Sequence, residues 1–200
     1  KTPLKVNDIF RIASQTKAVT SLAAMMLFEE GKFLLDEPVS KYIPEFKNPR
    51  VLVNFNEKDS SYFTEPAKSE PTIRQLLIHT SGIDYAGIGS KEGKAIFAKA
   101  GVPSGIGNHQ GLLADKMKIL AKLPLKHHPG ERYTYGLNTD VLGYLVEIWS
   151  GQSLDQFFKT RIFAPLGMND TYFYLPKEKH SRLVALYETK DGKLVQPSGY

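Results

Sequence analysis

The segment from Ser14 to Gly31, SQTKAVTSLAAMMLFEEG, restricts the possible folds more than any other part of the sequence. It contains no proline, is rich in residues that favour helices and ends at a glycine, so it predicts a helix over 14–30. Alanine, valine, leucine and methionine lie all round this helix, which predicts that it is buried inside the protein. The 42% hydrophobic content of the chain is enough to form a core around it, so we expect a globular protein.

The remaining elements follow from apolar periodicity and from capping residues. These signals predict helices over about 72–80 with Thr72 as N-cap, over 112–123, over 139–150, and over 154–164 with Ser153 as a possible cap. Residues 85–110 are rich in glycine and contain one short helical candidate, 91–100, so we expect a mobile, exposed connection there. Residues 51–70 are polar and predict a surface excursion. After Arg182 the pattern predicts two strands joined at Asp191–Gly192, a hairpin turn sequence.

Composition excludes several classes of protein. The net charge of +5 is spread along the chain without a basic stripe or a known nucleic-acid-binding module, so we expect no nucleic-acid partner. The absence of cysteine excludes disulfides and thiolate chemistry, although it leaves the compartment open. The longest apolar run, Ala18–Phe28, is about half the roughly 20 residues that a membrane span requires, so we expect no membrane span.

No metal or cofactor site is expected either. The adjacent His127 and His128 cannot both face one metal ion from a regular element, and no carboxylate at ligand spacing accompanies them.

The pair Ser14 and Lys17 stands at the start of the predicted 14–30 helix. Residues three apart in a helix share a face, so the lysine amine can reach the serine hydroxyl. A serine hydroxyl needs a nearby base to become a strong nucleophile, and a helix N-terminus stabilises developing negative charge. A chain with this many serines and lysines contains about one such pair by chance, so an N-cap serine followed by a surface lysine is the alternative.

Five segments in order and at similar spacing resemble class C β-lactamases, low-molecular-weight penicillin-binding proteins and the related family VIII esterases. They are FRIASQTKAVTS at 10–21, TIRQLLIHTSG at 72–82, PGERYTYG at 129–136, TDVLGYLVE at 139–147 and FAPLGMNDT at 163–171. The resemblance covers most of the chain. It implies an α/β fold class, in which this chain is the mostly helical portion of the β-lactamase/transpeptidase-like fold with a C-terminal β-hairpin.

The resemblance also implies a catalytic set. Ser14 would be acylated by the substrate, Lys17 would assist as base, and Tyr135 would form a hydrogen bond near both. A tyrosine beside a cationic amine can share the proton between nucleophilic attack and departure of the leaving group. The alternative for Tyr135 is a core aromatic whose hydroxyl is satisfied locally.

The second motif departs from the Tyr-x-Asn form of β-lactamases. Leu137 stands two residues after Tyr135, and Asn138 follows it. We therefore rank ester and other small acyl substrates above β-lactams, and we keep Asn138 as a candidate substrate-binding residue. Two other candidates are set aside: Ser81 lacks the Gly-x-Ser-x-Gly pattern of a nucleophile elbow, and His79 is expected to fix a turn rather than to transfer protons.

The third motif of the family, a strand with Lys-Thr-Gly or His-x-Gly, is expected beyond Tyr200, and the first strands are expected before Lys1. We therefore expect residues 1–200 to form a partial catalytic domain. Lys190-Asp191-Gly192 mimics the third motif, but its turn chemistry favours the hairpin. An incomplete domain would expose apolar surface, which predicts self-association.

Two functions from different classes follow. The first is a serine hydrolase that acts through an acyl-enzyme on an ester, an amide, a β-lactam or a peptidoglycan-like peptide. The second is a catalytically silent relative that binds such peptides or a protein partner. Relatives of this kind are typically bacterial and often exported, which suggests a periplasmic or exported protein without establishing its location.

Overall fold

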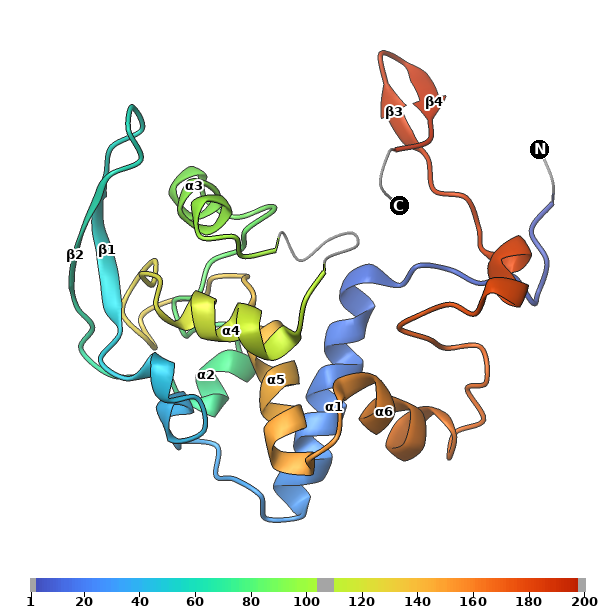
Figure 1. The fold of residues 1–200 in the computed structure, drawn as a ribbon, viewed down its shortest axis with the longest axis horizontal. Helices are drawn as coiled ribbons and strands as arrows, with labels where there is room; N and C mark the ends of the chain where they lie inside the picture. The colour runs from blue at the N-terminus through green and yellow to red at the C-terminus, as the bar shows by residue number, and fades with distance from the viewer. Residues whose placement is uncertain (1–2, 104–109, 198–200) are drawn as a thin grey trace.

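The computed structural model describes residues 3–103 and 110–197 (Figure 1). Its helices are α1 Thr16–Glu29, α2 Ile73–Leu77, α3 Lys91–Lys99, α4 Leu113–Ala121, α5 Asn138–Ser150 and α6 Leu154–Phe158. Its strands are β1 Arg50–Phe55, β2 Tyr62–Pro66, β3 Glu188–Lys190 and β4 Lys193–Val195. Five short helical segments join them: η1 Ala13–Gln15, η2 Val39–Lys41, η3 Pro44–Phe46, η4 Lys159–Phe163 and η5 Lys177–Arg182.

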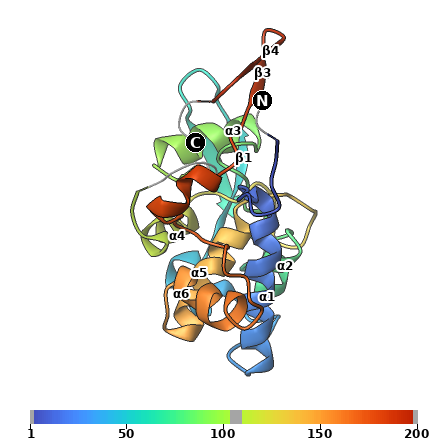
Figure 2. The same ribbon diagram turned by 90° about the vertical axis from the view of Figure 1, so that its right-hand side faces the viewer.

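Helix α5 forms the centre of the helical body. It packs against α1, α2, α4 and α6, and Figures 1 and 2 both show α1, α5 and α6 side by side. Its inward residues Val141, Leu142, Leu145 and Val146 are completely or almost completely buried. At Gly143 the helix lies so close to its neighbours that an added Cβ would be 2.9 Å from Leu154. The mixed helical fold with a C-terminal hairpin confirms the predicted fold class.

Helix α1 is buried on one side only, so the prediction of a helix buried all round is wrong for the described residues. Thr20, Ala23, Ala24 and Leu27 are buried, whereas Leu22 is 46% exposed. Because α5 and α6 both contact α1, the helix has one covered face, and no described element covers the face that carries Leu22. Its end at Gly31, which has a φ of 71°, agrees with the predicted boundary.

Residues 50–66 contain two strands that the sequence reading did not predict. β1 and β2 pair antiparallel, with a register shift between Leu52 and Asn54, and they project at the edge of the helical body (Figure 1). The backbone of β1 also bonds on its other edge to Leu125. The segment does lie at the surface, as expected, but the β-branched and aromatic residues Val51, Val53 and Phe55 were the missed strand signal.

Much of the glycine-rich stretch is buried rather than an exposed connection, which corrects that prediction. Tyr85 lies in the core, and so do Ile96, Phe97 and Val102 around α3. The reason is that α3 is amphipathic and turns its large apolar residues inward. Part of this stretch, residues 104–109, lies outside the described residues.

Two helix starts show how capping differs from place to place. Thr72 caps α2 as predicted, in a capping box with Gln75. Ser153 is the N-cap residue of α6, but its side chain makes no capping bond; instead the N–H of Leu154 donates to Glu147 Oε1 at 2.9 Å. The predicted continuous helix after Ser153 changes at Lys159 into a π-turn segment, η4.

The predicted hairpin after Arg182 is present but shorter. β3 and β4 pair antiparallel around Asp191 and Gly192, which both have positive φ, as a type I′ turn requires. The hairpin stands away from the helical body in both views (Figures 1 and 2). No helix of residues 3–103 and 110–197 combines the length and the apolar character that crossing a membrane requires.

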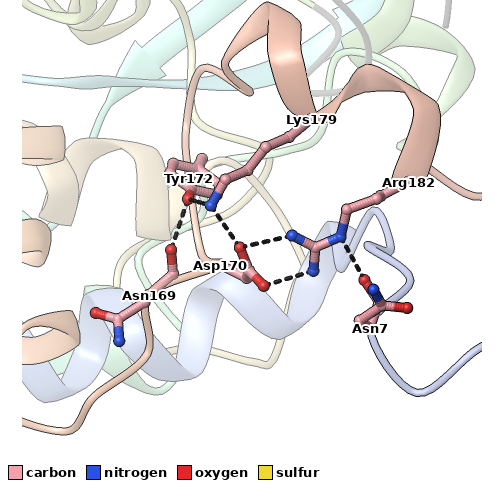
Figure 3. Close-up of polar contacts among 6 residues, drawn as sticks. All are labelled: Asn7, Asn169, Asp170, Tyr172, Lys179 and Arg182. Carbon is pink, nitrogen blue, oxygen red and sulfur yellow. Dashed lines mark hydrogen bonds and ion pairs between the residues drawn. The ribbon is translucent and has the colours of Figure 1, made fainter.

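A polar cluster ties the segment before this hairpin to the segment before η1 (Figure 3). Asp170 accepts from Arg182 at 2.5 Å and from Lys179 at 2.6 Å, and Lys179 also contacts Tyr172. Arg182 Nε then donates to the carbonyl of Asn7 at 2.7 Å, and Ile9 and Leu183 form a parallel bridge beside it. The two cations hold the pKa of Asp170 well below its usual range.

The segment that carries Tyr135 lies directly on residues 79–84. Thr134 N–H donates to the carbonyl of His79 at 2.8 Å, and Leu137 N–H donates to the carbonyl of Asp84 at 3.2 Å. Gly136 lies between these bonds, and a Cβ added there would overlap the carbonyl oxygen of Ile83. The sequence around Tyr135 therefore needs a glycine for close backbone approach.

We expect Gly136→Ala to lower the free energy of unfolding by about 3 kcal/mol, because the backbone of Ile83 cannot move away as a flexible side chain could. Gly31→Ala is the matched control: its φ is positive but nothing lies within 4 Å, so it should cost only the about 1–2 kcal/mol of a left-handed residue. Urea unfolding measures both, and equal costs would contradict the argument.

Candidate active site

Ser14 lies at an irregular start of the helical body. It is the middle residue of η1, which leads directly into α1, and its side chain is exposed. The preceding residue, Ala13, has a φ of 44°, a left-handed conformation that is costly for a residue with a Cβ. This turn presents the serine hydroxyl at the helix N-terminus, where the helix dipole favours negative charge.

Lys17 and Tyr135 both reach the hydroxyl of Ser14. Lys17 Nζ donates to Ser14 Oγ at 3.2 Å, as their spacing in the helix predicts. Tyr135 Oη donates to the same oxygen at 2.8 Å, across 121 residues of sequence. The structure therefore brings the three predicted catalytic residues together: Ser14 from η1, Lys17 from the start of α1 and Tyr135 from the loop before α5.

Aromatic rings surround the lysine amine. Lys17 Nζ lies 4.9 Å from the ring centre of Tyr135 and 5.6 Å from that of Tyr85. These two rings stack on each other, with centres 5.6 Å apart and planes 17° apart. The ring of His79 lies 5.1 Å from that of Tyr135. The ring faces attract the cation and hold the amine near Ser14.

The pKa values of Tyr135 and Asp140, near Ser14 and Lys17, are both shifted. Burial alone would raise the pKa of Tyr135, but hydrogen bonds with Lys17 and Ser14 bring its pKa below the ordinary value. Burial raises the pKa of Asp140 to about 6, although the positive charge of Lys17 partly opposes this. The negative charge of Asp140 raises the pKa of Tyr135, which opposes the effect of the positive charge of Lys17. The pKa of Tyr135 therefore depends on two charges, the Lys17 ammonium, which lowers it, and the half-buried Asp140 carboxylate, which raises it.

Asn138 lies behind Tyr135 and not beside Ser14. It is completely buried: its Oδ1 accepts from Ser81 Oγ, and its Nδ2 contacts His79 Nδ1 at 3.0 Å and the carbonyl of Thr134. Leu137, at the position of the β-lactamase asparagine, is also buried. In this structure both the oxygen and the nitrogen of the Asn138 side-chain amide are bonded within the protein, so its contact with substrate stays a prediction.

His79 takes the turn position expected of it. It has a φ of 56° directly after α2, and its carbonyl accepts from Thr134. Burial and the charge of Lys17 lower its pKa, which favours the neutral ring. The adjacent histidines serve separate contacts: His127 bonds Thr134 Oγ1 at 2.8 Å, and His128 pairs with Glu65. Among residues 3–103 and 110–197, no three metal-binding side chains gather.

Sequence reasoning missed Tyr85 and Asp140 as parts of this site. Tyr85 comes three residues after the Ser81–Gly82 turn, inside a stretch read as an exposed connection, so its burial was not anticipated. Asp140 comes five residues after Tyr135 and lies in the first turn of α5. Acidic residues are common in the first turn of a helix, so nothing in the sequence connected Asp140 with Lys17.

Comparisons with known proteins identify the family of the chain. The family model described as Beta-lactamase matches residues 1–200. Protein Rv1367c of Mycobacterium tuberculosis is 38% identical over 185 residues, which are 92% of this chain and 44% of that protein. Esterase EstB of Burkholderia gladioli is 35% identical over 176 residues, which are 86% of this chain and 40% of that esterase.

A solved structure gives the same result for the fold. Unliganded simvastatin synthase (LovD) from Aspergillus terreus superposes with a TM-score of 0.77 and 30% identity, covering 98% of this chain and 48% of that one. The chain spans about half the length of the relatives it matches. On the match over its whole length and on these relatives, the chain belongs to the Beta-lactamase family.

Proposed function

We propose that this chain carries the nucleophile of a serine hydrolase that forms an acyl-enzyme. The observation that carries the proposal is that Ser14 Oγ lies within hydrogen-bond distance of both Lys17 Nζ and Tyr135 Oη. An N-cap serine with a surface lysine would not require a distant tyrosine hydroxyl on the same oxygen. The same arrangement argues against the silent binding module, which needs no activated hydroxyl.

The reaction follows from these contacts. The Lys17–Tyr135 pair acts as base in the form that has lost one proton, which the lowered pKa of Tyr135 favours. Ser14 Oγ attacks the carbonyl carbon of the substrate, and its hydroxyl proton passes to the Tyr135 oxygen beside the Lys17 ammonium. The tetrahedral intermediate collapses when the leaving-group oxygen takes that proton, which leaves the acyl group on Ser14. Water then attacks the ester carbon, gives its proton to the same pair, and releases the acid and free Ser14. An alcohol in place of water would give acyl transfer.

Esters are the favoured substrate class. Leu137 and Asn138 are buried, so neither offers an amide to the substrate beside Tyr135 in this structure. EstB carries the name of an esterase, and a related solved structure is described as EstCE1, a hydrolase with promiscuous acyltransferase activity. We propose a small ester as substrate, ahead of a β-lactam or a peptidoglycan-like peptide.

The chain is proposed to be part of a larger catalytic domain. Its coverage of about half of its relatives supports this. Self-association of the isolated chain stays a prediction, supported by exposed apolar side chains such as Phe10 and Leu22. A relative of the fold is described as an octameric penicillin-binding protein homologue.

In the longer protein that contains this chain, a fluorophosphonate probe should label Ser14, because its hydroxyl contacts both Lys17 Nζ and Tyr135 Oη. Peptide mapping by mass spectrometry identifies the labelled serine, and Ser14→Ala should abolish both labelling and ester hydrolysis. The control is Ser81→Ala, which removes a buried hydroxyl that bonds Asn138 and should leave Ser14 labelled. Labelling at Ser81, or undiminished labelling of Ser14→Ala, would sink the proposal.

The same longer protein should hydrolyse short-chain p-nitrophenyl esters with a higher kcat/KM than a chromogenic cephalosporin. The reason is that the position of the β-lactamase asparagine holds the buried Leu137. Steady-state kinetics on both substrates measures the ratio. A clear preference for the cephalosporin would refute the ester assignment and leave the hydrolase class intact.

Asp140→Asn should stabilise the fold above pH 6. A raised pKa means that the folded state holds the proton of Asp140 more tightly than the unfolded chain does, so ionised Asp140 costs stability. This cost is absent below the unfolded value of 3.8, grows as the pH rises to about 6, and then stays constant. A shift of about two pKa units corresponds to about 3 kcal/mol.

Urea unfolding of Asp140→Asn and of the unsubstituted chain should therefore differ at pH 7.5 and converge near pH 4. Asp36→Asn is the contrasting control, because Arg74 lowers the pKa of Asp36 and the charge of Asp36 helps the fold. A stabilisation by Asp140→Asn that is independent of pH would contradict the burial of a charge.

A further inference from the structure

The buried side chain of Asp84 has no part in the reaction described above. It is 3% exposed, and it precedes Tyr85, whose ring stacks on Tyr135 and faces Lys17. A buried carboxylate is expensive unless it is paired and hydrogen-bonded. The contacts that satisfy Asp84 therefore show what it holds in place.

The carboxylate of Asp84 accepts hydrogen bonds from the loop that follows it. Oδ1 accepts from Tyr85 N–H at 2.8 Å, and Oδ2 accepts from Ser90 N–H at 3.2 Å and from Ser90 Oγ at 2.6 Å. Ser90 Oγ accepts in turn from Gly93 N–H, at the start of α3. Lys126 Nζ lies 3.7 Å from Oδ2 and supplies the opposite charge. One side chain thus fixes both ends of the loop from Tyr85 to Ser90.

Two glycines make room for this carboxylate. A Cβ added at Gly89 would overlap Oδ1 of Asp84, and a Cβ added at Gly93 would overlap Oδ2. Neither glycine has the positive φ that would by itself explain the residue type. The backbone is therefore wrapped closely around the carboxyl group, which leaves it little freedom to change its position.

The backbone of the same residue reaches the segment of Tyr135. The carbonyl of Asp84 accepts from Leu137 N–H at 3.2 Å, and the carbonyl of Ile83 lies against Gly136. Tyr135 is therefore held from two directions by one short segment, through its backbone on one side and through the ring of Tyr85 on the other.

From this geometry we propose that Asp84 is a positioning residue for the hydrolase reaction: its carboxylate fixes the Tyr85 loop, and the Tyr85 ring fixes Tyr135 against Ser14 and Lys17. The inference rests on the proposed function. It deepens that function by adding a residue that acts only through Tyr85 and Tyr135. Loss of the carboxylate should let the loop move and lengthen the 2.8 Å contact between Tyr135 and Ser14.

The test compares Asp84→Asn with the unsubstituted longer protein on a p-nitrophenyl ester. Asparagine keeps the size but turns an NH2 group toward N–H donors that need an acceptor. We expect kcat to fall by about 10- to 100-fold, as for an approximately 1 Å misplacement, with KM changed less than about threefold. Asp36→Asn, which removes an exposed carboxylate from an ion pair with Arg74, is the matched control and should leave both constants unchanged.

A pH profile separates positioning from simple loss of stability. The titratable groups around Tyr135 are Lys17 of α1, His79 after α2, Tyr85 in the loop and Asp140 of α5. Lys17 and Ser14 keep the pKa of Tyr135 below its ordinary value, so a displaced Tyr135 should titrate at higher pH. The limb of the kcat profile that depends on Tyr135 should move to higher pH in Asp84→Asn and stay in place in Asp36→Asn.

Ser90→Ala keeps the test decisive if Asp84→Asn fails to fold. It removes one hydroxyl bond to Asp84 and should lower kcat in the same direction, with a smaller effect. A folded Asp84→Asn or Ser90→Ala with unchanged kcat and an unchanged pH profile would overturn the inference, whereas activity that survives Ser14→Ala would instead overturn the proposed function.

Discussion

The packing of α1 against α5 is the contact on which the site depends. Ser14 and Lys17 share one face at the start of α1, but Tyr135 belongs to the loop that leads into α5. The approach of these two helices brings the tyrosine hydroxyl to 2.8 Å from the serine. Apolar burial along α5 drives that approach, so the geometry of the reactive group rests on side chains that never meet a substrate.

Hydrogen bonds among polar side chains next to the Tyr135 segment supplement this apolar packing. Ser81, Asn138 and His79 form a buried chain of hydrogen bonds, and Asp84 forms another with its loop. Burying such groups is favourable only when each finds its partner, so a small displacement costs several contacts at once. Apolar packing sets how near the helices lie, and on our proposal the two polar clusters fix the position of the Tyr135 ring. The proton transfer that we propose for Tyr135 requires both kinds of contact.

Local patterns predicted those features of the fold and site that depend on neighbouring residues. The spacing of Ser14 and Lys17, the N-cap at Thr72 and the turn at Asp191–Gly192 each involve residues within a few positions of one another, and all three were predicted. Tyr135 was identified through the family resemblance. The burial of Tyr85 and the open face of α1 depend on which elements pack together, and periodicity does not carry that information. β1 and β2 were missed because neither strand alternates regularly between buried and exposed residues.

The polar cluster around Asp170 also bears on the order in which the chain folds. Arg182 bonds the carbonyl of Asn7 across 175 residues, and Leu183 pairs with Ile9. During synthesis the N-terminal part of a chain emerges first, so Ser14 leaves the ribosome long before the partners of the segment that precedes it. Contacts this distant in sequence close late, because the loop between them must be ordered first. We therefore expect the α1–α5 pair to assemble before the segment that precedes Ser14 is fixed, so that Ser14 takes its final position late in folding.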